Sequence, residues 1–314
     1  MSKLKVAVYG VGGVGGYFGA VLARAGNPVS LIARGQHLHT IREHGLHIQT
    51  PKEDFTVTPV KASDNSADIG PVDIVIVGVK AWQVPDAARA MRPLIGANTR
   101  VVPLQNGVEA VEQLAQALGR EHVLGGLCRV IASIAGPGSI KIGGMEPTVV
   151  LGELDGSELS GNAKALLEAF RAASVNVQAA ADIQAALWDK WLFIAAVSGV
   201  GAVARATVGE VRESGPTRAL LQQMMEEVAA VGRKRGVRQA GDIVARTMSF
   251  IDAMPKEGTA SMQRDVADGR PSELEAIIGS LVRFGKAAGV PTPAAEFVYA
   301  SLLPQEKRAR ATRS

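Results

Sequence analysis

The chain has 314 residues, of which 47% are hydrophobic and 20% charged, and this is enough to build a sizeable core in two domains. Its single cysteine, Cys128, excludes an intramolecular disulfide, and residues 1–30 do not have the order of a signal peptide. The uncharged apolar stretch at residues 192–204 is shorter than the ~20 residues that span a bilayer, and it predicts a buried helix. We expect a globular cytoplasmic protein with no membrane partner, in which Cys128 is buried and inert.

The net charge of +4 comes from the end of the chain. Residues 307–314 hold four basic side chains and no acidic one, so the remainder is neutral. A basic tail can touch nucleic acid or a membrane surface, but we expect a solvated terminus and no nucleic-acid partner. The five histidines do not combine with cysteines or acidic residues in a metal-ligand spacing, so no metal site is expected.

In the first half, short β-branched runs alternate with helical stretches, which is typical of a parallel sheet with crossover helices. Residues 122–154 predict an antiparallel extension of this sheet, with a hairpin turn at Gly136-Pro137-Gly138. Further on we expect a helix near 160–173 and a strand at 176–181. The strands expected before residue 110 are 5–10, 28–34, 72–80 and 99–107.

From Asp182 onward, helical periodicity dominates and β-branched clusters disappear. We therefore predict an α/β fold with an N-terminal, doubly wound Rossmann-type domain followed by an all-helical domain. The expected boundaries are 1–181 for the Rossmann-type domain, 182–306 for the helical domain, and 307–314 for the basic tail.

A glycine cluster follows the first expected strand and opens an apolar helix. Gly10, Gly12 and Gly15 match G-x-G-x-x-G in the strand-turn-helix context that gives this motif its meaning. Such glycines let backbone approach a pyrophosphate at a helix N-terminus. The alternative is a glycine-rich turn with no ligand. The expected cofactor-binding residues of this loop are Gly10, Val11, Gly12, Gly13, Val14 and Gly15.

Arg34 stands at the end of the second strand, where an NAD site normally has an acidic side chain for the ribose hydroxyl. An arginine suits a 2′-phosphate through charge-assisted bonds, so NADP (as NADPH) is favoured over NAD. Sites for S-adenosylmethionine and FAD also use glycine-rich turns, but they usually need the missing acid. A solvated surface arginine is the remaining alternative.

Three further polar residues lie where chemistry is plausible. Lys80 and Asn106 come at the carboxyl ends of the third and fourth strands, the edge where open α/β sheets bind ligands, unless they merely meet water there. Lys190 lies in a helix of apolar and aromatic residues. Desolvation would lower the pKa of this lysine and suit it as a proton donor, whereas a lysine extending to solvent along its stem would have no such role.

Several stretches in chain order resemble the ketopantoate reductases (2-dehydropantoate 2-reductases), and they cover nearly the whole chain. They are the glycine motif, VKAWQVPDA (79–87), PLQNGV (103–108), LWDKW (187–191) and SMQRDVADGRPSELE (261–275). The resemblance implies NADPH-dependent reduction of 2-dehydropantoate (ketopantoate) to pantoate, a step of pantothenate biosynthesis.

The resemblance also implies roles for individual residues. Lys190 is the general acid, and Ser261 binds the substrate carboxylate. Glu273 bonds the region of the reacting oxygen and the cofactor and holds Lys190, although an acid at this position can also simply open a helix. Lys80 and Asn106 lie beside the nicotinamide and the substrate.

The chain departs from the family pattern at positions that the family uses to recognise the substrate. Ile194 and Ser198 replace asparagines on the face of the Lys190 helix, Val208 replaces another, and Gly258 stands where one usually precedes the serine motif. Ile194 and Ser198 are still expected to line the substrate pocket. Two alternatives therefore stay open: a reductase of a different branched 2-oxo acid, and a non-catalytic NADP-binding regulator. The oligomeric state, a homodimer included, is also open.

Overall fold

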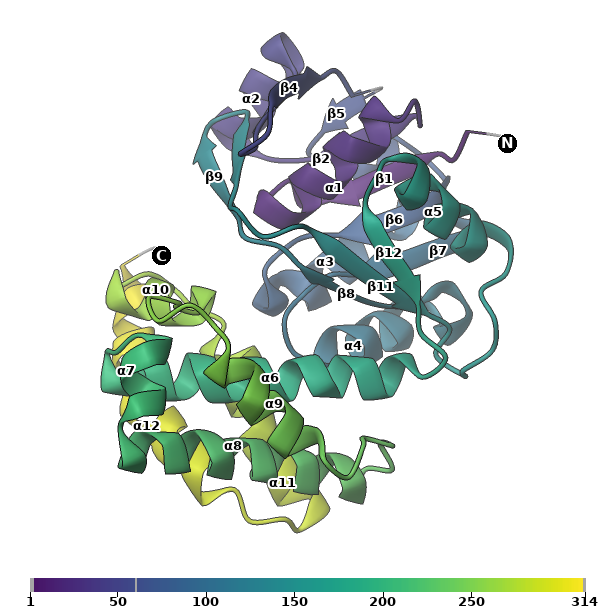
Figure 1. Ribbon diagram of the computed structural model, residues 1–314. Coiled ribbons are helices and arrows are strands. Elements are labelled where there is room, and N and C mark those ends of the chain that lie inside the picture. The colour runs from purple at the N-terminus through teal and green to yellow at the C-terminus, as the bar shows by residue number, and fades with distance from the viewer. Residues whose placement is uncertain (1–2, 60, 313–314) are drawn as a thin grey trace. The chain divides into compact units, whose positions relative to one another are not determined.

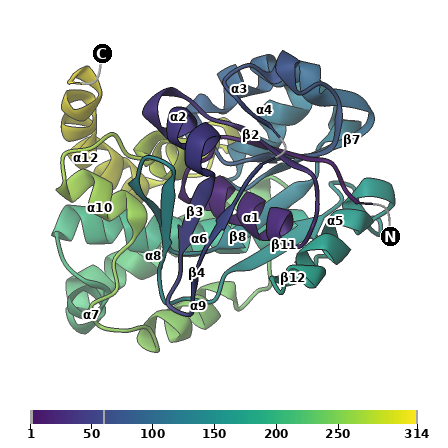
Figure 2. The same ribbon diagram turned by 90° about the horizontal axis from the view of Figure 1, so that it is seen from above.

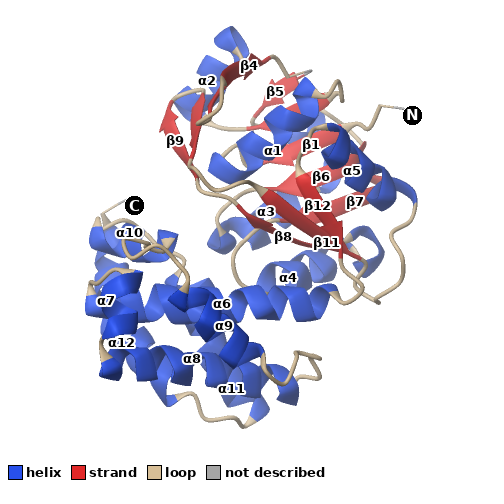
Figure 3. Ribbon diagram, viewed as in Figure 1, coloured by secondary structure: helices blue, strands red, loops and turns tan. Residues whose placement is uncertain are grey.

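The computed structural model describes residues 3–59 and 61–312, and the chain divides into two compact units (Figure 1). Unit 1 comprises residues 1–105 and 110–183, and unit 2 comprises residues 106–109 and 184–314. All described strands belong to unit 1, and the described part of unit 2 is helical (Figure 3). The α/β fold class with a following helical domain is confirmed.

The centre of unit 1 is a parallel five-stranded sheet with the order β5-β2-β1-β6-β7. The four strands expected from the sequence are present. The edge strand β5 was not expected, because its sequence Lys-Ala-Ser has no β-branched residue. Strand order reverses between β1 and β6, which is the switch point where doubly wound folds bind ligands. The bounds are β1 (Val6–Tyr9), β2 (Val29–Ile32), β5 (Lys61–Ser63), β6 (Val72–Val77) and β7 (Ile95–Pro103).

The expected antiparallel extension of this sheet is wrong, although the hairpin turn at Gly136-Pro137-Gly138 is confirmed. The hairpin joins a separate four-stranded sheet, β4-β3-β10-β9, and the other strands form a three-stranded sheet, β12-β11-β8. The bounds are β3 (Leu46–Gln49), β4 (Asp54–Val57), β8 (Gly125–Arg129), β9 (Ala132–Gly136), β10 (Ser139–Ile142), β11 (Thr148–Gly152) and β12 (Asn176–Ala179).

Among the described residues, no strand extends the central sheet beyond β7, and the outer edge of β7 offers few backbone groups for pairing. The amide of Leu104 donates to Val77 on β6, so the nitrogen of Pro103 faces outward, where it has no hydrogen to donate. His122 Nδ1 contacts the outward carbonyl of Thr99 at 3.0 Å. A single bridge, Val101 to Val123, therefore stands in place of a ladder.

Helix α1 packs between the central sheet and the four-stranded sheet, since it contacts β1, β2 and β6 as well as β3, β4, β9 and β10 (Figure 2). The ring of Phe18 on α1 lies edge-on to that of Phe170 on α5, with centroids 5.7 Å apart. The helices and turns of this half are α1 (Gly13–Arg24), α2 (Gly35–His44), η1 (Ser66–Asp68), η2 (Ala81–Gln83), α3 (Val84–Ala90), η3 (Arg92–Leu94), α4 (Glu109–Leu118), η4 (Arg120–His122) and α5 (Gly161–Ala172).

Helix α6 carries Lys190. By length and composition α6 could cross a membrane, but 67% of its most apolar window is buried inside the protein, as in a core helix. The elements that follow are α6 (Ile183–Ala204), α7 (Val208–Glu213), α8 (Gly215–Lys234), α9 (Ile243–Asp252), α10 (Ser261–Ala267), the π-helical η5 (Glu275–Gly279), α11 (Ser280–Ala288) and α12 (Pro293–Ala311).

Residues 307–311, expected to belong to a solvated basic tail, continue helix α12, and Lys307 and Arg308 are exposed on it. Ala309 is 6% exposed, and Arg310 Nε lies 2.7 Å from the carboxylate of Glu306, so these last turns are tied to the unit. Arg313, also assigned to that tail, lies outside the described residues.

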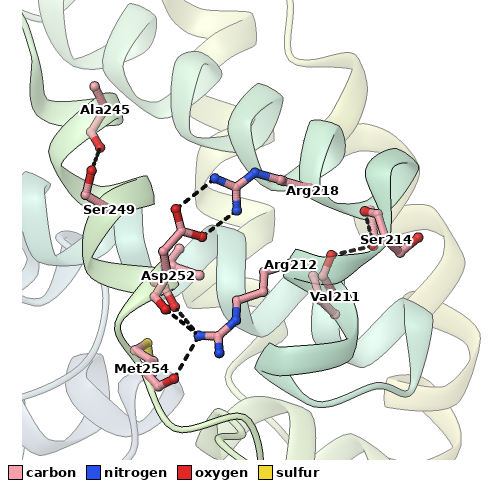
Figure 4. Close-up of polar contacts among 10 residues, drawn as sticks. Val211, Arg212, Ser214, Arg218, Ala245, Ser249, Asp252 and Met254 are labelled. Atoms are coloured by element: carbon pink, nitrogen blue, oxygen red, sulfur yellow. Dashed lines mark hydrogen bonds and ion pairs between the residues drawn. The ribbon is translucent and has the colours of Figure 1, made fainter.

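Two arginines fix the end of α9 (Figure 4). Arg218 pairs with both carboxylate oxygens of Asp252. Arg212 Nη1 caps the helix end, where carbonyls lack intrahelical partners, by donating at 2.8, 2.9 and 2.7 Å to the carbonyl oxygens of Ile251, Asp252 and Met254. These bonds hold the beginning of the segment that leads to Ser261.

Candidate functional site

In unit 1 the glycine loop turns directly from β1 into α1. Gly10 has a φ of +97°, in the region that glycine tolerates and other residues rarely adopt. A Cβ on Gly15 would lie 2.3 Å from the carbonyl oxygen of Gly10, and one on Gly13 would lie 2.7 Å from the backbone of Ala132. These glycines let strand, helix and hairpin approach one another. Val11 and Val14 lie between them, and Val11 is 5% exposed.

Gly12 differs from its neighbours. It is the N-cap of α1, and a Cβ placed on it would meet no atom closer than 3.7 Å, the carbonyl oxygen of Gly78. The protein's own packing therefore does not require glycine here. The first turn of α1 carries no acidic residue, so nothing there repels an anion at the helix N-terminus. This loop fits the pyrophosphate of a dinucleotide.

Arg34 and Lys80 are exposed residues in the loops after β2 and β6. Arg34 is the N-cap of α2, two residues beyond the end of β2. Lys80 is the N-cap of η2, and its Nζ lies 5.8 Å from the ring centre of Trp82. Both side chains can therefore meet a ligand from solvent.

Sequence reasoning missed three residues around this loop. Gly78 packs against Gly15, because a Cβ placed on Gly78 would lie only 2.7 Å from the Cα of Gly15. Gln105, just after β7, donates from its Nε2 to the carbonyls of Val77, at the end of β6, and Val79. Its Oε1 is a buried acceptor with no hydrogen-bond partner in the part of the chain described. His37 accepts a 2.9 Å hydrogen bond from the amide of Gly138, and burial lowers its pKa. The one signal in the sequence is that Gly78 directly follows the apolar strand β6.

In unit 2 the structure brings Asn106 and Glu273 together, although 167 positions separate them. Asn106 Nδ2 donates to Glu273 Oε2 at 3.1 Å. Glu273 is 6% exposed, and its carbonyl accepts from the amide of Ile277 at 2.9 Å. A Cβ on Gly107 would lie 2.7 Å from the carbonyl oxygen of Ala276, so glycine allows the segment after Asn106 to approach η5.

Lys190 is 9% exposed on α6, between Trp188 and Trp191, whose rings meet edge to face at 4.9 Å. The indole of Trp191 donates to the carbonyl of Ile277 in η5 at 2.9 Å. A π-helical turn frees such carbonyls, and these turns are frequent at functional sites. Trp191 thus joins the helix of Lys190 to the turn that follows Glu273.

The structure gives no hydrogen bond from the remaining expected substrate-site residues to Asn106 or Glu273 in the part of the chain described. Ser261 is exposed at the first position of α10. Ile194 is half-buried, whereas Ser198 is 1% exposed and lies within the packed interior. Val208 is 5% exposed and lines an internal cavity of about 10 Å³, large enough for about one water, with Val197, Val211, Ile251 and others.

Comparison with known proteins gives two family matches, which follow one another along the chain. The family described as ketopantoate reductase PanE/ApbA matches residues 6–156, and its C-terminal counterpart matches residues 182–306. A curated relative, the 2-dehydropantoate 2-reductase of Mesorhizobium japonicum, is 30% identical over 95% of this chain and 96% of its own length.

Solved structures agree. The crystal structure of a PanE/ApbA family ketopantoate reductase from Ralstonia eutropha is 32% identical, with a TM-score of 0.88, and covers 98% of this chain and 100% of its own. A D-mandelate dehydrogenase solved with NADH and anilino(oxo)acetate has a TM-score of 0.86 at 23% identity, covering 98% and 99% of the two chains, and it shows likeness of fold.

Proposed function

This chain belongs to the ketopantoate reductase family, and we propose that it is a cytoplasmic enzyme that reduces 2-dehydropantoate (ketopantoate) to pantoate with NADPH, a step of pantothenate biosynthesis. Family membership makes it an oxidoreductase with a 2-oxo acid reductase fold. The observation that carries the finer proposal is the hydrogen bond from Asn106 to the buried carboxylate of Glu273, in the same unit as Lys190.

Unit 1 would hold the cofactor. Gly12 leaves open space at the N-terminus of α1, where backbone amides can donate hydrogen bonds to a pyrophosphate. Arg34, exposed beyond β2, would bond the 2′-phosphate, and Lys80 would lie beside the bound dinucleotide. When bound, NADPH supplies the hydride for the keto carbon.

Unit 2 would handle the proton. Lys190, 9% exposed on α6, donates a proton to the substrate oxygen as that oxygen gains negative charge. Glu273 orients the ammonium of Lys190, and Asn106 orients Glu273 through their 3.1 Å hydrogen bond. The exposed hydroxyl of Ser261 would bond the substrate carboxylate.

A second candidate is the reduction of a different branched 2-oxo acid by the same residues. Ile194 is half-buried and apolar, Ser198 is 1% exposed, and Val208 is 5% exposed, so none of the three offers an accessible hydrogen bond to a substrate hydroxyl. A pocket of this kind discriminates weakly between a substrate with a hydroxyl and one without it.

The test is a steady-state comparison with purified protein and NADPH. Ketopantoate is compared with 2-oxo-3,3-dimethylbutanoate, which lacks its hydroxyl, and with a panel of other 2-oxo acids. We expect NADPH oxidation with ketopantoate and a kcat/KM ratio over the analogue below roughly 100, because a lost hydrogen bond is worth ~1–3 kcal/mol. A ratio above ~10⁴ would show polar recognition of ketopantoate that these residues do not explain. NADPH binding without oxidation by any 2-oxo acid would contradict the enzyme assignment and favour a non-catalytic regulator.

A further inference from the structure

Helix α12 carries a buried carboxylate that the proposed reaction does not use. Glu306 is 4% exposed. Its two oxygens accept the amide of Ser272 at 3.2 and 3.0 Å, and Oε2 also accepts the hydroxyl of Ser272 at 2.6 Å. Arg310, one helical turn later, lies 2.7 Å from Oε1 through its Nε. One carboxylate therefore collects three donors from two segments of unit 2.

The bonds from α12 leave Ser272 with little freedom. Arg310 Nη2 donates to the carbonyl of Ser272 at 3.0 Å, so the amide, hydroxyl and carbonyl of this fully buried residue are all engaged. The hydroxyl oxygen also accepts from the amide of Leu274 at 3.3 Å. The carbonyl of Ser272 and the amide of Leu274 belong to the two peptide groups that flank Glu273. Both peptide planes around Glu273 are thus held by one cluster.

Stability alone is a poor account of this arrangement. The carboxylate of Glu306 loses its hydration in the interior, while the side chain of Arg310 keeps 35% of its surface exposed to water, so the net contribution of this ion pair to folding is small. What the cluster supplies is a fixed geometry for the chain at Glu273, whose side chain meets Asn106. A misplacement of about 1 Å in such a group can cost ~10²-fold in rate.

We propose that Glu306 and Arg310 are positioning residues that act through Ser272 to fix the carboxylate of Glu273. The inference rests on the proposed function for its kinetic consequence, and it extends the site to the last turns of the chain. Residues 306–310 lie outside the motifs that carry the family resemblance.

The test compares two buried carboxylates on or against α12. Glu306→Gln removes the charge beside Arg310, and Glu227→Gln is the matched control. Glu227, 6% exposed on α8, accepts the amides of Ala294 and Ala295 at the other end of α12. The matched control for Arg310→Ala is Arg308→Ala, which removes the same positive charge from an exposed position on the same helix.

We expect Glu306→Gln to lower kcat by ~10- to 100-fold and to shift the pH dependence of kcat, with the NADPH dissociation constant unchanged. Arg310→Ala should act in the same direction, while Glu227→Gln and Arg308→Ala stay within about twofold of the wild type. Equal kinetic losses in Glu306→Gln and Glu227→Gln would reduce the cluster to a structural role and overturn the proposal.

A second readout does not depend on turnover. Carbon NMR of the Glu273 carboxyl group, assigned with Glu273→Gln, should show a changed chemical shift in Glu306→Gln and no change in Glu227→Gln. If the wild type reduces no 2-oxo acid, the proposed function fails while this measurement still decides the positioning. An unchanged Glu273 signal in Glu306→Gln would overturn it.

Discussion

The glycine loop of unit 1 and the Asn106–Glu273 cluster of unit 2 are built by opposite means. The loop consists of backbone groups brought close by the absence of side chains, within about ten consecutive residues and the end of β6. The cluster consists of polar side chains from segments far apart in the chain, joined by hydrogen bonds in a buried environment. Substitutions in the loop should therefore alter cofactor binding, and those in the cluster should alter the rate.

The largest expected effect separates these two roles. Lys190→Ala should lower kcat by ~10²–10⁴ and leave the NADPH dissociation constant near that of the wild type, as expected when a general acid is lost. Lys307→Ala, at an exposed position on α12, is the control. Steady-state kinetics and a binding titration check both quantities. Loss of NADPH binding together with the rate would mean that Lys190 is structural.

The next effect concerns the choice of cofactor. Arg34→Asp should raise the KM for NADPH by ~10- to 100-fold more than the KM for NADH, because a charge-assisted phosphate contact is worth ~1.5–3 kcal/mol and the new acid repels the phosphate. Parallel titrations with the two nucleotides measure it. Equal changes for both would refute the assignment of Arg34.

Two glycines sharpen the comparison within the loop. Gly12→Ala should fold normally, because the nearest atom is 3.7 Å away, yet raise the NADPH dissociation constant by about tenfold, or ~1.4 kcal/mol. Gly15→Ala should instead destabilise the protein by about 1–3 kcal/mol, because its Cβ would lie 2.3 Å from the carbonyl oxygen of Gly10. Thermal unfolding and nucleotide titration of both variants separate the effects. A destabilised Gly12→Ala would show that packing, and not a ligand, requires this glycine.

The smallest effect is a pH dependence of stability in unit 1. Burial lowers the pKa of His37, so the unfolded chain binds a proton there more readily than the folded one. The contribution of His37 to the free energy of unfolding is fully present above its unfolded pKa of about 6.5. It is lost as the pH falls below 6.5 toward the lowered pKa of the folded state. Urea unfolding of the wild type and of His37→Gln from about pH 8 to about pH 5 should show a steeper fall in the free energy of unfolding for the wild type. If the free energy of unfolding depends on pH in the same way in both proteins, His37 is not the source of this pH dependence.

The same contrast explains what the sequence could predict. Gly10, Gly12 and Gly15 follow a buried strand within a few residues, so periodicity and composition were sufficient to locate them. The partition into three sheets was not predictable, because it depends on Pro103 and His122 at the edge of β7 and on short strands such as β5.

The cluster in unit 2 lay further beyond pattern reading. No local signal joins Asn106 to Glu273, and only the family resemblance suggested that both belong to one site. Glu306 was missed because the basic run begins one residue after it, and that run was interpreted as a solvated tail. A buried acid that binds backbone groups 34 residues away has no periodic signature.

The central claim is that this chain transfers a hydride from NADPH to the keto carbon of a 2-oxo acid. The most direct test uses NADPH that carries deuterium at the transferred position of its nicotinamide ring, with ketopantoate and purified protein, followed by mass spectrometry of the product. The account predicts pantoate with one deuterium on the carbon that bears the new hydroxyl. Pantoate without deuterium, or no 2-hydroxy acid from ketopantoate or any other branched 2-oxo acid, would contradict it.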